Sequence, residues 1–256
     1  MKTLVSWSSG KDSAWMVHRL RQRGDVEIGV LLTTINEPAQ RVAMHAVRVE
    51  VLQAQAEALG CPLWMVPIPS PCPNEVYEQA MRETVARAVG EGFTHAAFGD
   101  LFLEDIRKYR EERLAGSGLT PIFPLFDADP SYTPRLAREM VAGGLRARIT
   151  CLNPKVVDRA FAGREFDAAL LDELPAAIDP CGERGEFHTC AYAGPMFNHP
   201  IAVDTGITVE RDGFVFTDLT IPNRLPHSQM TRLPDSQVTR LPHSQITRLS
   251  DSRITR

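Results

Sequence analysis

Residues 4–13 read Leu-Val-Ser-Trp-Ser-Ser-Gly-Lys-Asp-Ser, and this stretch decides the fold. Apolar residues 3–7 predict a buried strand, and a loop of serine and glycine leads from it into a predicted helix over 12–23. A glycine without a Cβ lets backbone N–H groups approach an anion closely, and a helix N-terminus attracts negative charge. The order of strand, loop and helix therefore predicts a phosphate-binding turn.

The side chains of this loop suit a nucleotide. Lys11 adds a full positive charge, and Asp12 is expected beside a phosphate only if a divalent cation bridges the two, so Asp12 is the predicted Mg²⁺ ligand. The predicted nucleotide-binding residues of the loop are Ser8, Ser9, Gly10, Lys11, Asp12 and Ser13. The alternative is a polar strand-to-helix turn that binds nothing.

The segment 8–13 is not the common P-loop, which needs G-x-x-x-x-G-K-[ST]. It resembles the S-G-G-K-D-S signature of the PP-loop ATP pyrophosphatases, the adenine nucleotide alpha hydrolase-like proteins, and departs from it in having Ser9 for the first glycine. The resemblance implies an enzyme that uses ATP and Mg²⁺ and cleaves ATP between its α and β phosphates. A substrate oxygen is adenylated, and a nucleophile then displaces AMP.

Composition argues against several classes of protein. The 256 residues are 43% hydrophobic, which suffices for one large or two modest cores, and a formal charge of −4 gives no electrostatic case for nucleic-acid binding. No run of about 18 apolar residues predicts a membrane helix, and the N-terminal segment does not resemble a signal peptide. Five cysteines without a C-x-x-C pair favour a reducing, cytoplasmic location over a disulfide framework or a structural zinc site.

Strands and helices alternate through the first half of the chain, which predicts a parallel sheet with right-handed crossovers. Strands are expected over 27–34, 62–68, 94–99 and 121–126, and helices over 41–59, 74–90, from about 103, and over 133–141. The fold class is therefore α/β, a Rossmann-like (HUP-type) parallel sheet with helices on both faces.

Ligands bind such a sheet at the carboxyl ends of its strands. Leu32 and Thr33 end the second strand and are expected either to contact adenine or to pack as ordinary strand-end residues. Gly99 lets a ligand approach the backbone, and Asp100 lies at a strand end, so both are predicted site residues; the charged segment after them otherwise reads as a solvated helix. His45, near the start of the helix over 41–59, is either a capping residue or a grip on nucleotide or substrate.

The second half predicts a smaller α+β domain. A strand is expected over 145–152, a helix over 166–174, and short strands over 201–203, 207–210 and 214–219, the last two joined by a hairpin turn. Between them, the sequence Asp-Pro-Cys-Gly-Glu-Arg-Gly-Glu-Phe-His-Thr-Cys over 179–190 reads as a loop. Its Glu183 and Glu186 can hold a metal or deprotonate an amine, and His188 can act as an acid–base group at neutral pH. The alternative is a polar loop whose charges are solvated.

Gly99-Asp100 and the segment 182–189, together with the first loop, resemble the diphthine–ammonia ligase branch of the PP-loop superfamily over about residues 1–221. Its members carry a G-E-x-G-E-[FY]-x-T segment in a second domain that faces the ATP. In that family a carboxylate of diphthine on elongation factor 2 is adenylated, and ammonia completes the amide. Met44-His45 and His188 indicate a bacterial-style member, for which the resemblance implies the chemistry more securely than the acceptor.

The resemblance implies catalytic roles for Lys11, Asp100, Glu183, Glu186 and His188. Its expected partners are ATP, a carboxylate-bearing small molecule or protein side chain, and ammonia or another amine; a homodimer is left open. A nucleotide sensor without turnover and a simple ATP or AMP hydrolase are the alternative functions.

From Arg224 onward the unit Arg-Leu-Pro-His-Ser-Gln-Met-Thr recurs with a period of eight residues. Each unit has few large apolar groups, and most have a proline, so the tail predicts a disordered low-complexity segment. The expected domains are an ATP-binding domain over 1–130, a substrate-binding domain over 131–222 and the tail over 223–256.

Overall fold

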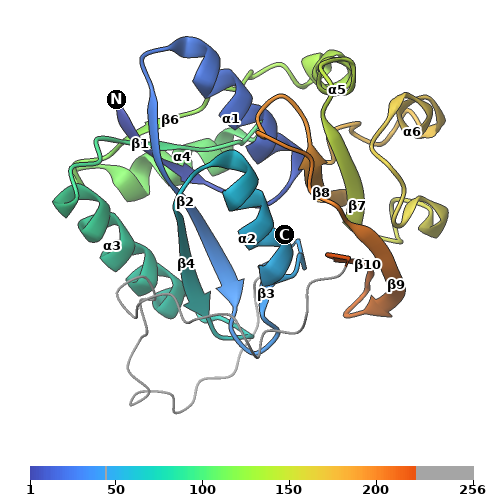
Figure 1. Ribbon diagram of the computed structural model, residues 1–256, viewed down its shortest axis with the longest axis horizontal. Helices are drawn as coiled ribbons and strands as arrows, with labels where there is room; N and C mark the ends of the chain where they lie inside the picture. Colours follow the sequence, from blue (N-terminus) through green and yellow to red (C-terminus); the bar gives the residue numbers. More distant parts are fainter. Residues whose placement is uncertain (44, 223–256) are drawn as a thin grey trace.

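A parallel sheet carries residues 7–10, the loop that the sequence predicts to bind phosphate and that we call the phosphate loop, in the computed structural model, which describes residues 1–43 and 45–222 (Figure 1). Its parallel strands lie in the order β4-β2-β1-β5-β6, and the antiparallel β3 pairs with the end of β2. They are β1 (Lys2–Ser6), β2 (Glu27–Asn36), β3 (Arg41–Val42), β4 (Leu63–Ile68), β5 (His95–Ala97) and β6 (Thr120–Ile122). The order reverses between β1 and β5, which is where doubly wound sheets bind their ligands.

Helices cover both faces of this sheet (Figure 1), as the sequence predicts. The helices are α1 (Lys11–Arg23), α2 (Val49–Leu59), α3 (Asn74–Gly90), α4 (Glu104–Leu114) and α5 (Thr133–Ala142). Alternate residues of β1 serve the two faces: Val5 packs in the cluster that contains α1 and α2, and Leu4 packs in the cluster that contains α3. The Rossmann-like class is therefore confirmed.

A separate antiparallel sheet forms the second half of the described chain, with strand order β8-β7-β10-β9. Its elements are β7 (Arg146–Leu152), β8 (Phe187–Ala193), β9 (Asp204–Arg211), β10 (Phe214–Thr220), helix α6 (Ala168–Glu173) and the single turns η1 (Pro130–Tyr132) and η2 (Arg159–Phe161). Ile149 of β7 and Cys190 of β8 belong to the same buried cluster as α1 and α2. The two sheets therefore share one core across α1.

The prediction of one helix over 41–59 is wrong for residues before Val49, where α2 begins. Residues 41–42 form β3, and a tight turn returns the chain, with Val42 N–H donating to the Val47 carbonyl at 2.8 Å and Ala46 at φ +56°. Arg41 and Arg48, on either side of this turn, both bind the carboxylate of Asp218 in β10, at 2.8 and 2.6 Å. The turn is thus shaped by an ion-pair cluster with a strand about 170 residues away.

Three other expectations differ from the structure. The strand expected over 121–126 ends at Ile122, because the chain turns and Phe126 N–H donates back to the Phe123 carbonyl. Residues 201–203 form no strand, and the expected loop over 179–190 ends in β8, which starts at Phe187. Met44, expected on a helix face, and the repeat tail lie outside the described residues. No helix among the described residues is long and apolar enough to cross a membrane.

Candidate functional site

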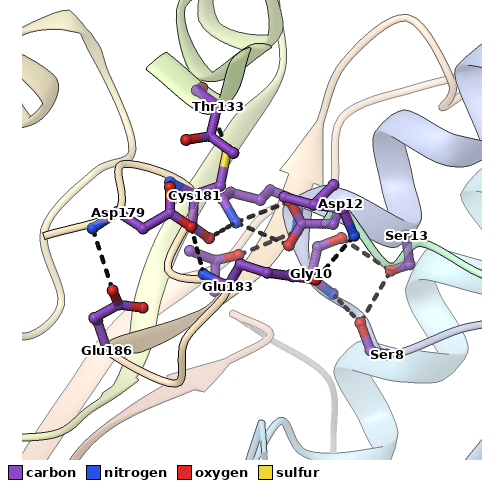
Figure 2. Close-up of polar contacts among 12 residues, drawn as sticks. Ser8, Gly10, Asp12, Ser13, Thr133, Asp179, Cys181, Glu183 and Glu186 are labelled. Carbon is purple, nitrogen blue, oxygen red and sulfur yellow. Dashed lines mark hydrogen bonds and ion pairs between the residues drawn. The ribbon is translucent and has the colours of Figure 1, made fainter. Parts of the chain in front are cut away.

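The phosphate loop follows β1 and ends where α1 begins at Lys11. The Ser8 and Ser13 hydroxyls lie 3.2 Å apart, and Ser13 Oγ donates to the Gly10 carbonyl at 3.0 Å (Figure 2). Gly10 N–H reaches Ser8 Oγ only at 3.4 Å, a long contact. At the start of a helix, where an anion is favoured, the loop therefore presents the Ser8 and Ser13 hydroxyls and the Gly10 N–H, whose hydrogen bond to Ser8 is long and weak.

Ser9, the residue that departs from the S-G-G-K-D-S signature, adopts the left-handed conformation with φ +71°. Its carbonyl accepts hydrogen bonds from Ala191 N–H at 2.9 Å and from Gln55 Nε2 at 3.0 Å. Its hydroxyl is buried and has no hydrogen-bond partner among the described residues. The backbone here has the shape that glycine adopts without cost, and the serine side chain adds strain and an unsatisfied polar group.

Ser9→Gly is expected to stabilise the protein. Relief of the left-handed strain and of the buried hydroxyl is worth roughly 1–3 kcal/mol, against about 0.4–1 kcal/mol for the greater freedom of glycine in the unfolded chain. Urea unfolding should show a higher midpoint with an unchanged slope. Ser9→Ala removes only the hydroxyl, so it should fall between the two proteins; a Ser9→Gly protein less stable than the wild type would contradict this account.

Lys11 is the lysine that the loop predicts, and its side chain is 2% exposed. Its Nζ donates to both Asp12 carboxylate oxygens, at 2.9 and 2.8 Å, and to the Cys181 carbonyl of the second half of the chain. Burial alone lowers the pKa of this ammonium, but the neighbouring Asp12 carboxylate and other acidic groups outweigh burial, so the net pKa is raised. Lys11 therefore carries its charge at neutral pH.

The segment 179–189 covers the loop and is held in shape by two buried carboxylates. Glu186 accepts from the N–H group of Asp179 at 3.2 Å (Figure 2). It also accepts from the N–H group of Arg184 at 2.8 Å. Asp179 in turn accepts from the N–H groups of Cys181, at 3.2 Å, and Glu183, at 2.9 Å. Both acids thus support the backbone of this segment, and Asp179 is a site residue that the sequence argument did not select.

Glu183 joins this segment to the end of β5. Its Oε1 accepts from Leu101 N–H at 2.8 Å, next to Asp100, whose carboxylate forms an ion pair with Arg110 at 2.5 and 3.0 Å. A Cβ on Gly99 would lie 3.3 Å from the Ser13 nitrogen, so this glycine allows β5 to pack against the first turn of α1. Burial, with the nearby Asp12 carboxylate, raises the pKa of Glu183 to about 8.

Two histidines, His45 and His188, pack together beside Gly10 of the loop. The rings of His45 and His188 lie 4.6 Å apart, and His45 Nδ1 is 3.2 Å from the Thr189 carbonyl. A Cβ on Gly10 would be only 2.9 Å from the His45 ring. Burial lowers the pKa of His45 to about 4 and, with the His45 ring beside it, that of His188 to about 3. His188 is therefore neutral at neutral pH, which corrects the expectation that it titrates there.

These two lowered pKa values predict a loss of stability in acid. The unfolded chain takes up protons near the ordinary histidine pKa and the folded chain does not. The contribution of these two histidines to stability is therefore complete above about pH 6.5 and falls as the pH drops towards 4, at up to about 1.4 kcal/mol per pH unit for each histidine. The variant with His45→Gln and His188→Gln should show a shallower pH dependence in urea unfolding. His199→Gln, at an exposed site, is the control; equal slopes in all three proteins would refute the effect.

Leu32 and Thr33 of β2 hold the start of the loop through the backbone of Trp7. The Leu32 carbonyl accepts from Trp7 N–H at 2.8 Å, and Thr33 Oγ1 donates to the Trp7 carbonyl at 2.7 Å. Both residues are buried, and contact with adenine stays a prediction. Gln55 of α2 also contacts the loop, through the Ser9 carbonyl, and was not predicted from the sequence. Its signal was weak: a glutamine four residues after Val51, on the apolar face of the helix.

The residues around Lys11 fit a nucleotide with Mg²⁺. Within residues 1–43 and 45–222, no group of three His, Cys, Asp or Glu side chains could hold a metal ion alone. Mg²⁺ usually keeps several waters and binds through one or two carboxylates and substrate phosphates, which Asp12 suits. Burial is the main cause of the raised pKa of Glu183, and repulsion by the Asp12 and Asp100 carboxylates adds to it; a cation would relieve that repulsion.

Comparison with known proteins gives two family matches. The model for the diphthamide synthase N-terminal domain matches residues 1–119, and the model for the diphthamide synthase C-terminal domain matches residues 133–218. No curated protein matches the chain. The first match contains the phosphate loop and Gly99-Asp100, and the second contains the segment 179–189.

Proposed function

The chain belongs to the diphthamide synthase family, and on that basis we propose that it is an ATP-dependent ligase that adenylates a carboxylate and then transfers ammonia to it. In the first step the carboxylate oxygen bonds to the α-phosphorus and the bond to the β-phosphate breaks, which releases pyrophosphate. In the second step the nitrogen of ammonia bonds to the acyl carbon, AMP leaves and one proton is released. The acceptor is a carboxylate-bearing small molecule or protein side chain.

The observation that carries the proposal is the position of Lys11. Its ammonium bonds both to Asp12 in the phosphate loop and to the Cys181 carbonyl, 170 residues away, in the segment that the second family match contains. A buried cation at this point can stabilise the charge that develops on the phosphates as pyrophosphate leaves, and such stabilisation is the main source of catalysis in phosphoryl chemistry. Mg²⁺, held in part by Asp12, would neutralise phosphate charge in the bound state.

Glu183 is our candidate for the base that activates ammonia. Its pKa of about 8 makes its carboxylate form, which predominates above that pH, a stronger base than an ordinary glutamate, and Oε1 is fixed by Leu101 N–H. Glu186 would hold the segment in shape, as its two backbone contacts favour. Asp100 would keep Arg110 near the end of β5, and His188, as a neutral ring, would accept or donate a hydrogen bond to substrate.

The test is nucleotide analysis after incubation of the whole protein with ATP, Mg²⁺ and ammonium, with and without a cell-extract fraction as the source of acceptor. AMP and pyrophosphate that appear only with extract and ammonium would support the ligase. AMP that needs neither would indicate a hydrolase, and ADP with phosphate would contradict the family chemistry. The exposed Lys108→Ala variant is a control that should behave as wild type.

A nucleotide sensor is the second candidate, and one observation favours it. Lys11 N–H, at the start of α1, donates to Thr189 Oγ1 at 3.1 Å, so this donor already has a partner in β8. A phosphate that took this N–H would have to displace Thr189 and so move the second sheet. ATP recovered intact on the protein, with no products under any addition, would support the sensor and contradict the ligase.

A further inference from the structure

Gln55 connects the phosphate loop to both neighbouring parts of the structure. Its side chain is fully buried in α2. Oε1 accepts from Trp7 Nε1 at 3.1 Å, and Trp7 directly follows β1. Nε2 donates to the Ser9 carbonyl at 3.0 Å and to the Ala191 carbonyl of β8 at 2.6 Å. One amide thus contacts three buried polar groups, two from residues 7–9 and one from β8.

The contact with Ser9 fixes the direction of the next N–H group. A trans peptide is planar, so its C=O and N–H point in opposite directions. The Ser9 carbonyl is held by Gln55 and by Ala191 N–H, at 3.0 and 2.9 Å, and therefore Gly10 N–H must point away from α2 and β8. Among the described residues its partner there is Ser8 Oγ, at 3.4 Å, so this N–H is available to a stronger acceptor.

We propose that Gln55 is a positioning residue for the nucleotide: it holds the Ser9–Gly10 peptide so that Gly10 N–H faces the phosphates, and it locks the loop to β8. The inference rests on the proposed function only in taking ATP as the ligand. The left-handed Ser9 needs this support, because a residue with a Cβ reaches that conformation only at a cost that its surroundings must offset.

Few side chains can replace this amide. Leucine would fill the space but would leave Trp7 Nε1 and the Ala191 carbonyl without their partner. A glutamate could accept from Trp7, but as a carboxylate it would face two carbonyl oxygens and the Cys190 Sγ, which lies 3.5 Å from Gln55 Nε2 and whose pKa burial raises to about 12. When it is protonated, it can donate to one of them. Burial beside acceptors raises the pKa of such a carboxyl, so Gln55→Glu should recover function as the pH falls.

The experiment measures ATP affinity by titration with a non-hydrolysable ATP analogue and Mg²⁺, at pH 6 and pH 8, for the wild type, Gln55→Glu and Gln55→Leu. Gln53→Ala is the matched control, on the same helix, at a side chain whose oxygen has no hydrogen-bond partner among the described residues. We expect Gln55→Glu to bind roughly tenfold to a hundredfold more weakly than the wild type at pH 8, the loss that one unsatisfied buried polar contact brings, and to approach the wild type at pH 6.

Gln55→Leu should be equally weak at both pH values, and thermal unfolding of each variant checks that it is folded. Affinity of Gln55→Glu equal to wild type at pH 8, or a loss that does not change with pH, would overturn the proposal. The readout needs no turnover, so a wild type that binds the analogue but forms no AMP would end the ligase proposal and leave this one standing. A wild type that binds no nucleotide would overturn both.

Discussion

Lys11→Ala is expected to abolish most pyrophosphate release from ATP, with a fall in kcat of roughly 10²- to 10³-fold, the usual cost of removing one group that stabilises developing charge. The reason is local: Lys11 is the buried cation at the junction of the loop and the segment 179–189, and the Asp12 carboxylate beside it would repel phosphate once the ammonium is gone. Pyrophosphate and AMP are measured together, at saturating ATP and Mg²⁺.

Two further variants make this result interpretable. Lys11→Met keeps most of the apolar stem of a side chain whose Nζ lies 5.5 and 5.7 Å from the Phe166 and Phe187 ring centroids, and it removes the charge. It should lose activity as fully as Lys11→Ala while unfolding closer to the wild type. Lys108→Ala, which removes an exposed lysine of α4, should leave the rate unchanged. Intact pyrophosphate release by Lys11→Met would remove the basis of the proposed chemistry.

Glu183→Gln is expected to lower ammonia-dependent AMP formation by roughly 10²- to 10⁴-fold, as expected for loss of a general base. The amide oxygen can still accept from Leu101 N–H, so the contact between the segment and β5 is preserved. Release of pyrophosphate in the first step should be affected much less. Glu112→Gln, at an exposed glutamate of α4, is the control.

The pH dependence gives the second readout for Glu183. Its pKa is raised to about 8, so the basic carboxylate predominates only above that pH, and kcat/KM for the amine should rise as the pH passes through 8. Hydroxylamine, which is a free base at neutral pH, keeps the titration of the nucleophile out of the profile. Glu183→Gln should lose this rise. The raised pKa of Glu183 also predicts that its contribution makes the wild type less stable as the pH rises from about 4.5 through 8. If Glu183→Gln keeps both the rise in kcat/KM and this loss of stability, another group is responsible for them.

The phosphate loop could be predicted from the sequence because its information is local. The apolar strand 3–7, the Ser/Gly turn and the helix that starts beside Lys11 are neighbours in the chain, and the alternation of strands and helices fixes the sheet around them. Gly99 was predicted from its place at a strand end and the segment 179–189 from its polar, glycine-containing sequence, and the family resemblance then linked both to the first loop. The structure brings both to that loop through Ser13 and Cys181.

What the sequence did not reveal depends on partners far along the chain. The turn before α2 is shaped by Asp218 in β10, which no periodicity near Arg41 or Arg48 can indicate. Residues 187–190 are polar enough to suggest a loop, yet they form a strand because β7 and Ser9 supply backbone partners. Gln55 could not be told from an ordinary helix residue in the sequence. Its importance comes from one donor, Trp7 Nε1, and two acceptors, the Ser9 and Ala191 carbonyls, which the folded chain brings to it.

The contact between Lys11 N–H and Thr189 Oγ1 means that the site can be completed only late in synthesis, after Thr189 has been made. The two residues are 178 positions apart, and at about 5–20 residues per second the ribosome needs roughly 10 to 40 s to make the chain between them. Throughout that time the loop sequence is present, but Lys11 lacks Thr189 and the Ser9 carbonyl lacks Ala191. An unfinished chain therefore carries the nucleotide motif without the finished site.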